Sequence, residues 1–136
     1  MGLYIVKIGK IKEKQEMKLS NGQMNIYLKS LNTISKKVKG KLAYCVARNI
    51  RKISNELTEF ERLKNEYIFE HGYEENGSYV IDVESQEYQD FLIFIKEYIN
   101  IEHEIDIMLI ELEEIYKSDL TGDEILQLDF MIKEDE

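Results

Sequence analysis

Apolar side chains recur alternately four and three residues apart between residues 41 and 70. This spacing is typical of a helix that packs against a second helix along one seam. At about 1.5 Å per residue, a helix over these residues spans roughly 45 Å. A single helix leaves such a seam exposed, so we expect an antiparallel neighbour or a second subunit to cover it. The seam consists of Val46, Ile50, Ile53, Leu57, Phe60 and Tyr67, with Lys64 as its polar position.

The chain contains no proline, which favours long uninterrupted helices. A second apolar repeat predicts a long helix over residues 85–117, apolar on more than one side. A shorter helix is expected over residues 23–37, which together with residues 41–70 makes up a basic helical region, 23–70. Thr121 followed by Glu124 has the spacing of a capping box and predicts a C-terminal helix over residues 120–133.

Strand patterns interrupt this helical sequence. Residues 3–8 alternate in the manner of a strand within an N-terminal β segment, 1–19, and residues 17–19 form a weaker candidate. The Asn76-Gly77 pair predicts a hairpin within residues 72–84, with a strand over residues 79–83 that pairs with 3–8 or with 17–19. At 136 residues we expect one mostly α domain: a long antiparallel helical hairpin, a shorter N-terminal helix, a small β-element and a short C-terminal helix.

Charge is distributed unevenly along the chain. Residues 1–52 contain 13 basic and two acidic residues, whereas residues 53–136 contain five basic and 25 acidic residues. The first part therefore has a charge of +11 and the second −20, within a total of −9. This polarity excludes a histone-like protein. The basic residues before position 53 are the ones that can form a positively charged surface.

Positive charge gathers on one side of the predicted 41–70 helix. At about 100° per residue, Lys41, Arg48 and Lys52 lie within about 40° of one another, opposite the seam. Two interpretations stay open: this face binds an anionic partner (nucleic acid, a nucleotide or an acidic protein), or it faces the chain's own acidic half or water. Duplex DNA is disfavoured because the net charge repels it. We call Lys41, Tyr44, Arg48, Arg51 and Lys52 the basic face.

No arrangement of residues typical of catalysis or metal binding is evident in the sequence. Cys45 is the single cysteine, and His71 and His103 lie far from it. We interpret Cys45 as a helix-packing residue, and His103 with Asp106 as a surface pair on a helix. Glycine-rich phosphate loops and zinc ligand sets are lacking. The prediction is therefore no enzyme activity, no cofactor and no metal. A lone cysteine and no apolar stretch of about 20 residues favour a cytoplasmic protein away from membranes.

The order of short motifs resembles a family of small uncharacterised helical proteins encoded by phages and prophages of low-GC Gram-positive bacteria. The resemblance covers residues 17–133 and implies a phage protein in the bacterial host cytoplasm, with no catalytic residues to transfer. The motifs are the turn Lys18–Gly22, Gly40–Tyr44 running into Ala47–Ile53, Glu56-Leu57 with Phe60-Glu61, the acidic hairpin at 74–77, and Leu120–Ile132.

These observations together predict a non-enzymatic interaction protein. We expect a homo-oligomer that binds a macromolecular partner in an assembly or accessory role, with the seam building the oligomer and the basic face meeting the partner. The alternative is an inhibitor of host antiviral defence. Such an inhibitor blocks a nuclease complex, or sequesters a nucleotide signal through the basic face.

Overall fold

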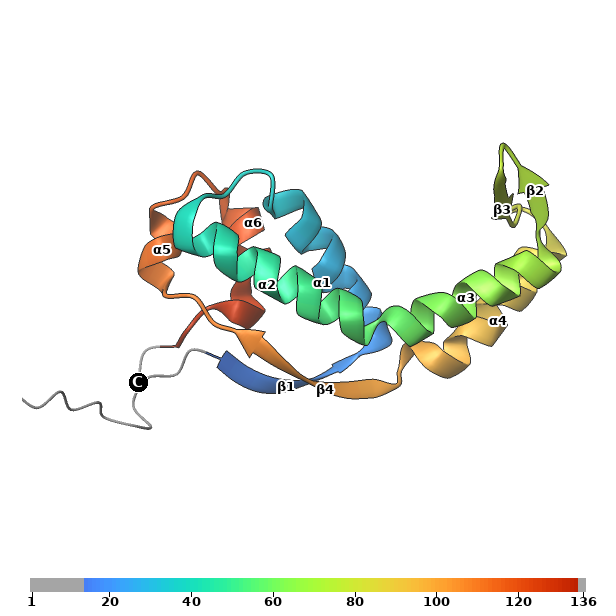
Figure 1. Cartoon of the computed structure of the whole chain (residues 1–136), viewed down its shortest axis with the longest axis horizontal. Coiled ribbons are helices and arrows are strands. Elements are labelled where there is room, and N and C mark those ends of the chain that lie inside the picture. Colours follow the sequence, from blue (N-terminus) through green and yellow to red (C-terminus); the bar gives the residue numbers. More distant parts are fainter. Residues whose placement is uncertain (1–13, 135–136) are drawn as a thin grey trace, which may run out of the picture.

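The computed structural model describes residues 14–134 as a mostly α-helical fold with a minor β component (Figure 1). The predicted strand at residues 3–8 lies outside these residues. Within them, no helix is long and apolar enough to cross a membrane. The elements are β1 (Lys14–Ser20), α1 (Asn21–Ile34), α2 (Gly40–Glu56), α3 (Thr58–His71), β2 (Tyr73–Glu75), β3 (Ser78–Val80), α4 (Gln86–Ile99), β4 (Glu102–Met108), α5 (Leu112–Tyr116), α6 (Gly122–Gln127) and a 3-10 turn (Asp129–Met131).

Strands β1 and β4 form a two-stranded antiparallel ribbon, in which Met17 lies opposite Ile105. The prediction of one long helix over residues 85–117 is therefore wrong, because α4 ends at Ile99 and β4 follows. The alternation along β4 explains this difference. Ile105 and Ile107 are buried, whereas Glu104 and Asp106 are exposed. A period of two matches a strand with one buried face.

Strands β2 and β3 form the hairpin around Asn76 and Gly77. Both turn residues have positive φ, at 51° and 84°, which is the backbone geometry of a tight two-residue hairpin turn. The predicted pairing of residues 79–83 with residues 17–19 is wrong. Residues 17–19 belong to β1 and pair with β4, and the segment near 79 pairs with its own hairpin partner because the turn brings that strand closest.

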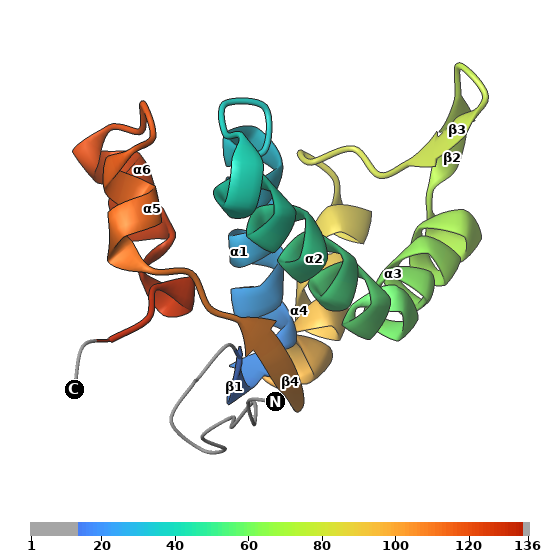
Figure 2. The ribbon, with the colours of Figure 1, turned by 60° about the vertical axis from the view of Figure 1, so that its left-hand side comes forward.

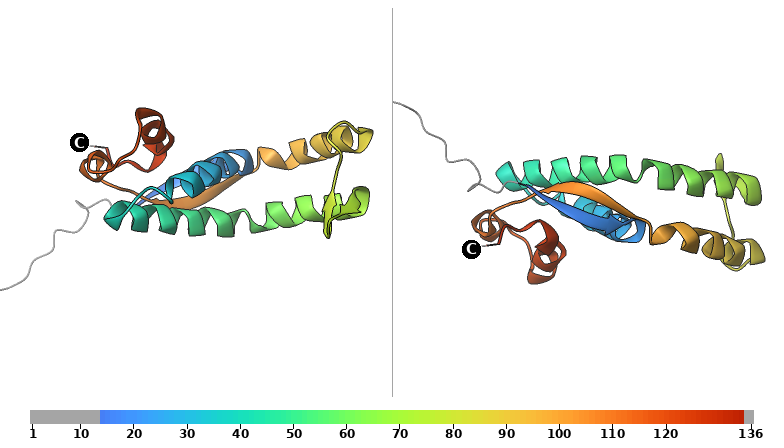
Figure 3. Two further views of the ribbon diagram at one scale, coloured as in Figure 1. Left: turned by 90° about the horizontal axis from the view of Figure 1, so that it is seen from above. Right: turned by 90° about the horizontal axis from the view of Figure 1, so that it is seen from below.

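The predicted 41–70 helix is divided at Leu57 into α2 and α3, which lie end to end (Figure 3). The Thr58 hydroxyl donates a hydrogen bond to the Ser54 carbonyl 3.2 Å away, a side-chain contact that bends helices. Beyond this bend, α3 runs beside α4, and the end of α4 nearest Ile99 also contacts α1. The predicted hairpin of two full-length helices is therefore limited to α3 and α4. We call these two helices, together with the β-strand pair Tyr73–Val80 at their far end, the arm.

The remaining elements form the body, where α1 and α2 pack together and α2 lies against β4 (Figures 1 and 2). Helices α5 and α6 close one end of the body. The predicted seam lies inside this chain: Val46 and Ile53 are fully buried, and Leu57 and Phe60 are 1 % and 5 % exposed, with Ile50 and Tyr67 half-buried. The chain's own elements thus cover most of the seam, and its expected role in building an oligomer stays a prediction.

Candidate anion-binding face of helix α2

Helix α2 is oriented by a polar residue in the middle of its buried side. Asn49 is completely buried, and its amide Nδ2 donates to the Met108 carbonyl at 2.9 Å while its Oδ1 accepts from the Met108 N–H at 2.8 Å. The Cys45 thiol, one turn earlier, donates to the same carbonyl at 3.3 Å. These bonds fasten α2 to the end of β4 and determine which side of the helix faces solvent.

The solvent side of α2 presents the basic face. Lys41, Arg48 and Arg51 are exposed, Tyr44 is 60 % exposed, and Lys52 is half-buried at the border of the face. The structure therefore places the five residues on one helix side, opposite the buried seam. An Arg guanidinium offers five donors in a planar fork, and an exposed Tyr ring adds a flat surface beside them.

The charges of the basic face are not neutralised by the acidic half of the chain as far as residues 14–134 show. No ion pair in that range involves Lys41, Arg48, Arg51 or Lys52. Elsewhere in the described range some cations are paired, such as Lys37 with Glu124 at 2.8 Å, and others, such as Lys29 and Lys96, are not. The basic face thus presents net positive charge to solvent in a chain with a total charge of −9.

A cavity of about 480 Å³ adjoins the N-terminal end of this face. Lys41 and Tyr44 line it from α2, Lys133 lines it from the C-terminal segment, and Leu109 and Ile110 supply apolar walls. Two carboxylates, Glu111 and Glu114, also line the cavity, and Glu111 lies 4.0 Å from Lys133. The cavity therefore combines both charge signs with an apolar wall, which is the usual character of a small-molecule site.

Cys45 borders this cavity but is 1 % exposed. Burial raises the pKa of its thiol to about 11, while the nearby Lys52 lowers that pKa by a smaller amount. Only a very small fraction of the residue is thiolate at neutral pH. Since the thiolate is the nucleophilic form, Cys45 serves packing and a hydrogen bond to β4.

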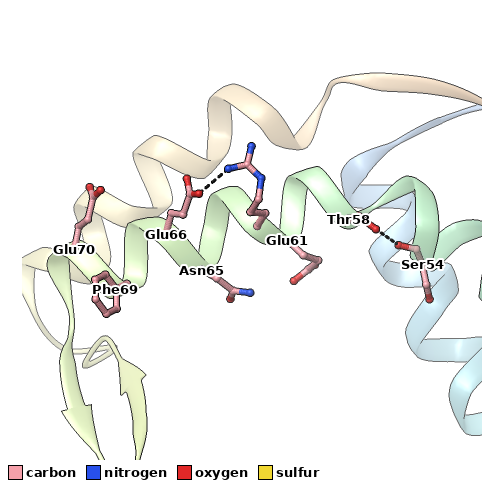
Figure 4. A pocket seen from close by; sticks show the side chains of 8 residues that line it. Ser54, Thr58, Glu61, Asn65, Glu66, Phe69 and Glu70 are labelled. Atoms are coloured by element: carbon pink, nitrogen blue, oxygen red, sulfur yellow. Dashed lines mark hydrogen bonds and ion pairs between the residues drawn. The ribbon is translucent and has the colours of Figure 1, made fainter.

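A larger hollow of about 670 Å³ lies over α3, as Figure 4 shows. Its lining includes three glutamates and a single cation, Arg62. That guanidinium is held by Glu59 at 2.8 Å and by Glu66 at 2.6 Å, which raises its pKa. Because its positive charge is already paired, this hollow is a weaker candidate for an anion than the basic face.

The exposed face of the β ribbon is acidic. Glu16 lies opposite Asp106, and the pKa of its carboxyl is raised chiefly by a hydrogen bond with Glu104 and by the negative charge of that residue. No cluster of His, Cys, Asp or Glu within the described range is arranged to hold a metal ion. The ribbon and α2 thus present opposite charges on different elements.

The interpretation of His103 and Asp106 as a pair on a helix surface is wrong. Both lie in β4 an odd number of residues apart, so their side chains point to opposite faces of the ribbon. His103 instead places Nδ1 3.2 Å from a Glu56 carboxylate oxygen of α2, and its Nε2 is buried without a hydrogen-bond partner among the described residues. Sequence periodicity gave no signal for this contact, because its partners are 47 residues apart.

Known proteins provide no relative from which a role for the basic face can be transferred. No family model matches the chain, and neither a curated protein nor a solved structure matches it. The phage or prophage relationship inferred from short motifs therefore stays a prediction.

Proposed function

We propose that this chain is a non-enzymatic interaction protein that binds an anionic macromolecular partner through the basic face of α2. The observation that supports this most strongly is the exposure of Lys41, Arg48 and Arg51 on one side of a helix, with no ion pair to any described residue. Side chains that serve only solubility need no such segregation. A positively charged face attracts a negatively charged partner and raises the rate at which the two associate.

The partner that fits this face best is an acidic protein surface. A helix 17 residues long presents its cations along a straight line, which suits a flat or helical acidic surface. Carboxylates accept two parallel hydrogen bonds from an Arg guanidinium, so Arg48 and Arg51 supply both charge and geometry. Duplex DNA has a much higher charge density and meets repulsion from the acidic ribbon and arm.

Charge reversal on the face tests this proposal. We expect Arg48→Glu with Lys52→Glu to weaken binding of a fluorescent poly-glutamate peptide at least tenfold in an anisotropy titration, and to remove its salt dependence. Lys29→Glu with Lys96→Glu is the matched control, since it makes the same change of charge at exposed sites on α1 and α4. Equal loss in both variants, or no loss in either, contradicts the proposal.

A second candidate, sequestration of a nucleotide, is favoured by the cavity beside Lys41 and Tyr44. Tyr44 offers a ring for base stacking, and Lys41 and Lys133 offer charges for phosphate. Ligand binding to the folded state raises its melting temperature, by an amount that corresponds to about 2.7 kcal/mol at a hundredfold excess over Kd. A nucleotide panel that leaves the melting temperature unchanged contradicts this candidate and leaves the acidic-partner proposal standing.

The setting of this activity is also a proposal. In a phage or prophage, as the motif resemblance implies, binding of an acidic partner serves virion assembly or an accessory role, or blocks a host nuclease complex. Proximity labelling from the chain in infected cells distinguishes these settings. Labelled virion components support the assembly role, and labelled host nuclease subunits support inhibition of defence.

A further inference from the structure

Two sets of hydrogen bonds show which backbone groups of the ribbon point away from the partner strand. The Asn21 N–H donates to the Ile101 carbonyl at 3.0 Å, which continues the β1–β4 ladder by one pair of odd-numbered residues. The Met108 N–H and carbonyl both bond Asn49 of α2, so they point away from β1. In an antiparallel pair these two orientations alternate along each strand.

This alternation determines the free edge of β1. Lys14, Glu16 and Lys18 direct their N–H and carbonyl groups to the side away from β4, because they lie opposite the even-numbered residues of that strand. No backbone group of these three residues forms a hydrogen bond on that side with any residue in the range 14–134. All three residues are exposed.

The edge of β4 that faces away from β1 has hydrogen-bond partners within the chain. Asn49 binds the backbone N–H of Met108. The next residue whose backbone points away from β1 is Ile110, and the C-terminal segment binds it: the Ile110 N–H donates to the Met131 carbonyl at 2.8 Å, and the Lys133 N–H donates to the Ile110 carbonyl at 2.7 Å. Helix α2 also packs along β4. The fold therefore closes part of one edge of the ribbon, whereas the described residues leave the edge of β1 open. An open edge is a template for another strand.

We propose that a second copy of this chain occupies the free edge, with the two β1 strands antiparallel about a two-fold axis at Met17. The result is a four-stranded sheet in the order β4–β1–β1–β4. This surface lies on the ribbon and is independent of the basic face on α2. It also differs from the seam, most of which the chain buries by itself.

Charged side chains favour this strand register over the registers shifted by two residues. The backbone groups that point away from β4 belong to the even-numbered residues of each β1 strand. The two β1 strands can therefore form hydrogen bonds only in registers that pair even-numbered with even-numbered residues, and these registers differ by shifts of two residues. With Met17 on the axis, Glu16 lies opposite the partner's Lys18, and the pair occurs twice. A slip by one step places Glu16 opposite the partner's Glu16 and Lys14 opposite the partner's Lys18. Opposite charges across strands stabilise a sheet and like charges destabilise it.

The same register is compatible with the hydrogen bonds that already exist. Each pair of Glu16 with the partner's Lys18 exchanges two main-chain hydrogen bonds, so the two pairs supply four. Pairing weakens at Ser20, whose N–H donates to the Gln23 side chain in the cap of α1. A lysine across the strand also offsets the repulsion that Glu16 receives from Glu104. A contact of this length buries little area, so we expect a Kd in roughly the micromolar range.

Complementary charge swaps test the register on the full-length chain. Native mass spectrometry and analytical ultracentrifugation are expected to show a dimer for the unmodified chain, and monomers for Glu16→Lys and for Lys18→Glu, because each variant opposes like charges. An equimolar mixture of the two variants restores opposite charges at both positions and is expected to form the heterodimer. Lys14→Glu is the matched control, since Lys14 faces Ser20 in this register, and it is expected to stay dimeric.

A cross-link tests the position of the axis. Directly opposed residues that share no hydrogen bonds have Cα atoms about 4.5 Å apart, which is within disulfide range. We expect Met17→Cys to give a disulfide-linked dimer under mild oxidation, and Gln15→Cys, on the same side of the strand, to give none. Buried Cys45 does not interfere.

Circular dichroism establishes first that each variant is folded like the unmodified chain. A monomer at all concentrations for the unmodified chain overturns the proposal, since it shows that the edge remains unpaired between copies. A dimer that persists in Lys18→Glu, a mixture that yields no heterodimer, or equal cross-linking by Met17→Cys and Gln15→Cys overturns it as well.

Discussion

One side chain, Asn49, anchors helix α2 to the ribbon through two hydrogen bonds. Its amide satisfies both backbone groups of Met108 inside the fold, so a leucine of similar volume leaves an N–H without a partner and a carbonyl with only the Cys45 thiol. We expect Asn49→Leu to lower the free energy of unfolding by about 2–3 kcal/mol, measured by urea denaturation.

Asn55 provides the control for this prediction. It lies on the same helix but is exposed and makes no side-chain hydrogen bond within the described range. We expect Asn55→Leu to change the free energy of unfolding by less than about 0.5 kcal/mol. If both leucine variants have the same stability, Asn49 does not anchor α2.

The carboxylates of the ribbon predict a second effect at the scale of single residues. The pKa of Glu16 is raised in the folded chain, mainly by Glu104, so the folded state disfavours its ionised form. The repulsion between the Glu16 and Glu104 carboxylates is fully present above the raised pKa of Glu16, and it is relieved as the pH falls through that pKa and Glu16 becomes protonated. We expect NMR titration to show the pKa of Glu16 moving back toward its ordinary value in Glu104→Gln. In Glu97→Gln, on the distant helix α4, the Glu16 titration should not move.

Among the elements, α6 depends most clearly on its cap. The Thr121 hydroxyl accepts from the Glu124 N–H at 3.2 Å, and the Glu124 carboxylate accepts from the Thr121 N–H at 3.0 Å. We expect Thr121→Ala to destabilise the fold by about 1 kcal/mol in thermal or urea unfolding. Thr33→Ala, at an exposed position within α1, should have a clearly smaller effect; equal effects contradict the role of the cap.

The same cap makes stability depend on pH. Lys37 first, and then Thr121, lower the pKa of Glu124 below its usual value. A lowered carboxyl pKa stabilises the folded state at neutral pH, and this contribution disappears as the pH falls through the lowered pKa. The stability difference between the unmodified chain and Glu124→Gln should therefore be largest near neutral pH and vanish in acid. A difference that is constant across this range contradicts the prediction.

Which elements could be predicted from sequence depends on where their partners lie. The basic face is a local property of one helix, so the 3.6-residue period alone placed its members together. The pattern around β4 is ambiguous, because Ile101, Ile105 and Leu109 are spaced four apart while Ile105 and Ile107 are spaced two apart. A strand forms there because β1, more than 80 residues earlier, supplies a partner. Neither that pairing nor the role of Asn49 is encoded in a local repeat.

At the scale of the whole molecule, the arm and the body differ in how they are held together. The arm is two helices and a hairpin, and its contacts centre on Tyr67, whose ring lies 4.4 Å from that of Phe94 and 5.6 Å from that of Phe91. Most of the fully buried side chains belong to the body. Elements with few buried contacts open at lower free energy than a core.

Hydrogen exchange measures this difference. We expect amides of α3 and α4 to exchange faster than those of α1 and α2, and Tyr67→Ala to accelerate exchange throughout the arm while leaving α1 and α2 protected. Tyr116→Ala, at a residue that is 71 % exposed, should change neither region. Acceleration that spreads equally through the body in Tyr67→Ala shows instead that the whole chain unfolds as one unit.

The pairing of β1 with β4 has a consequence for synthesis on the ribosome. Strand β1 and helices α1 and α2 emerge early, but β4 follows only after the arm has been translated. Until Met108 leaves the exit tunnel, Asn49 lacks its partner and the apolar side of α2 lacks part of its cover. Contacts this distant along the chain form late. The nascent chain therefore passes most of its translation with an incomplete core, and a ribosome stalled before residue 108 holds a protein that has yet to fold.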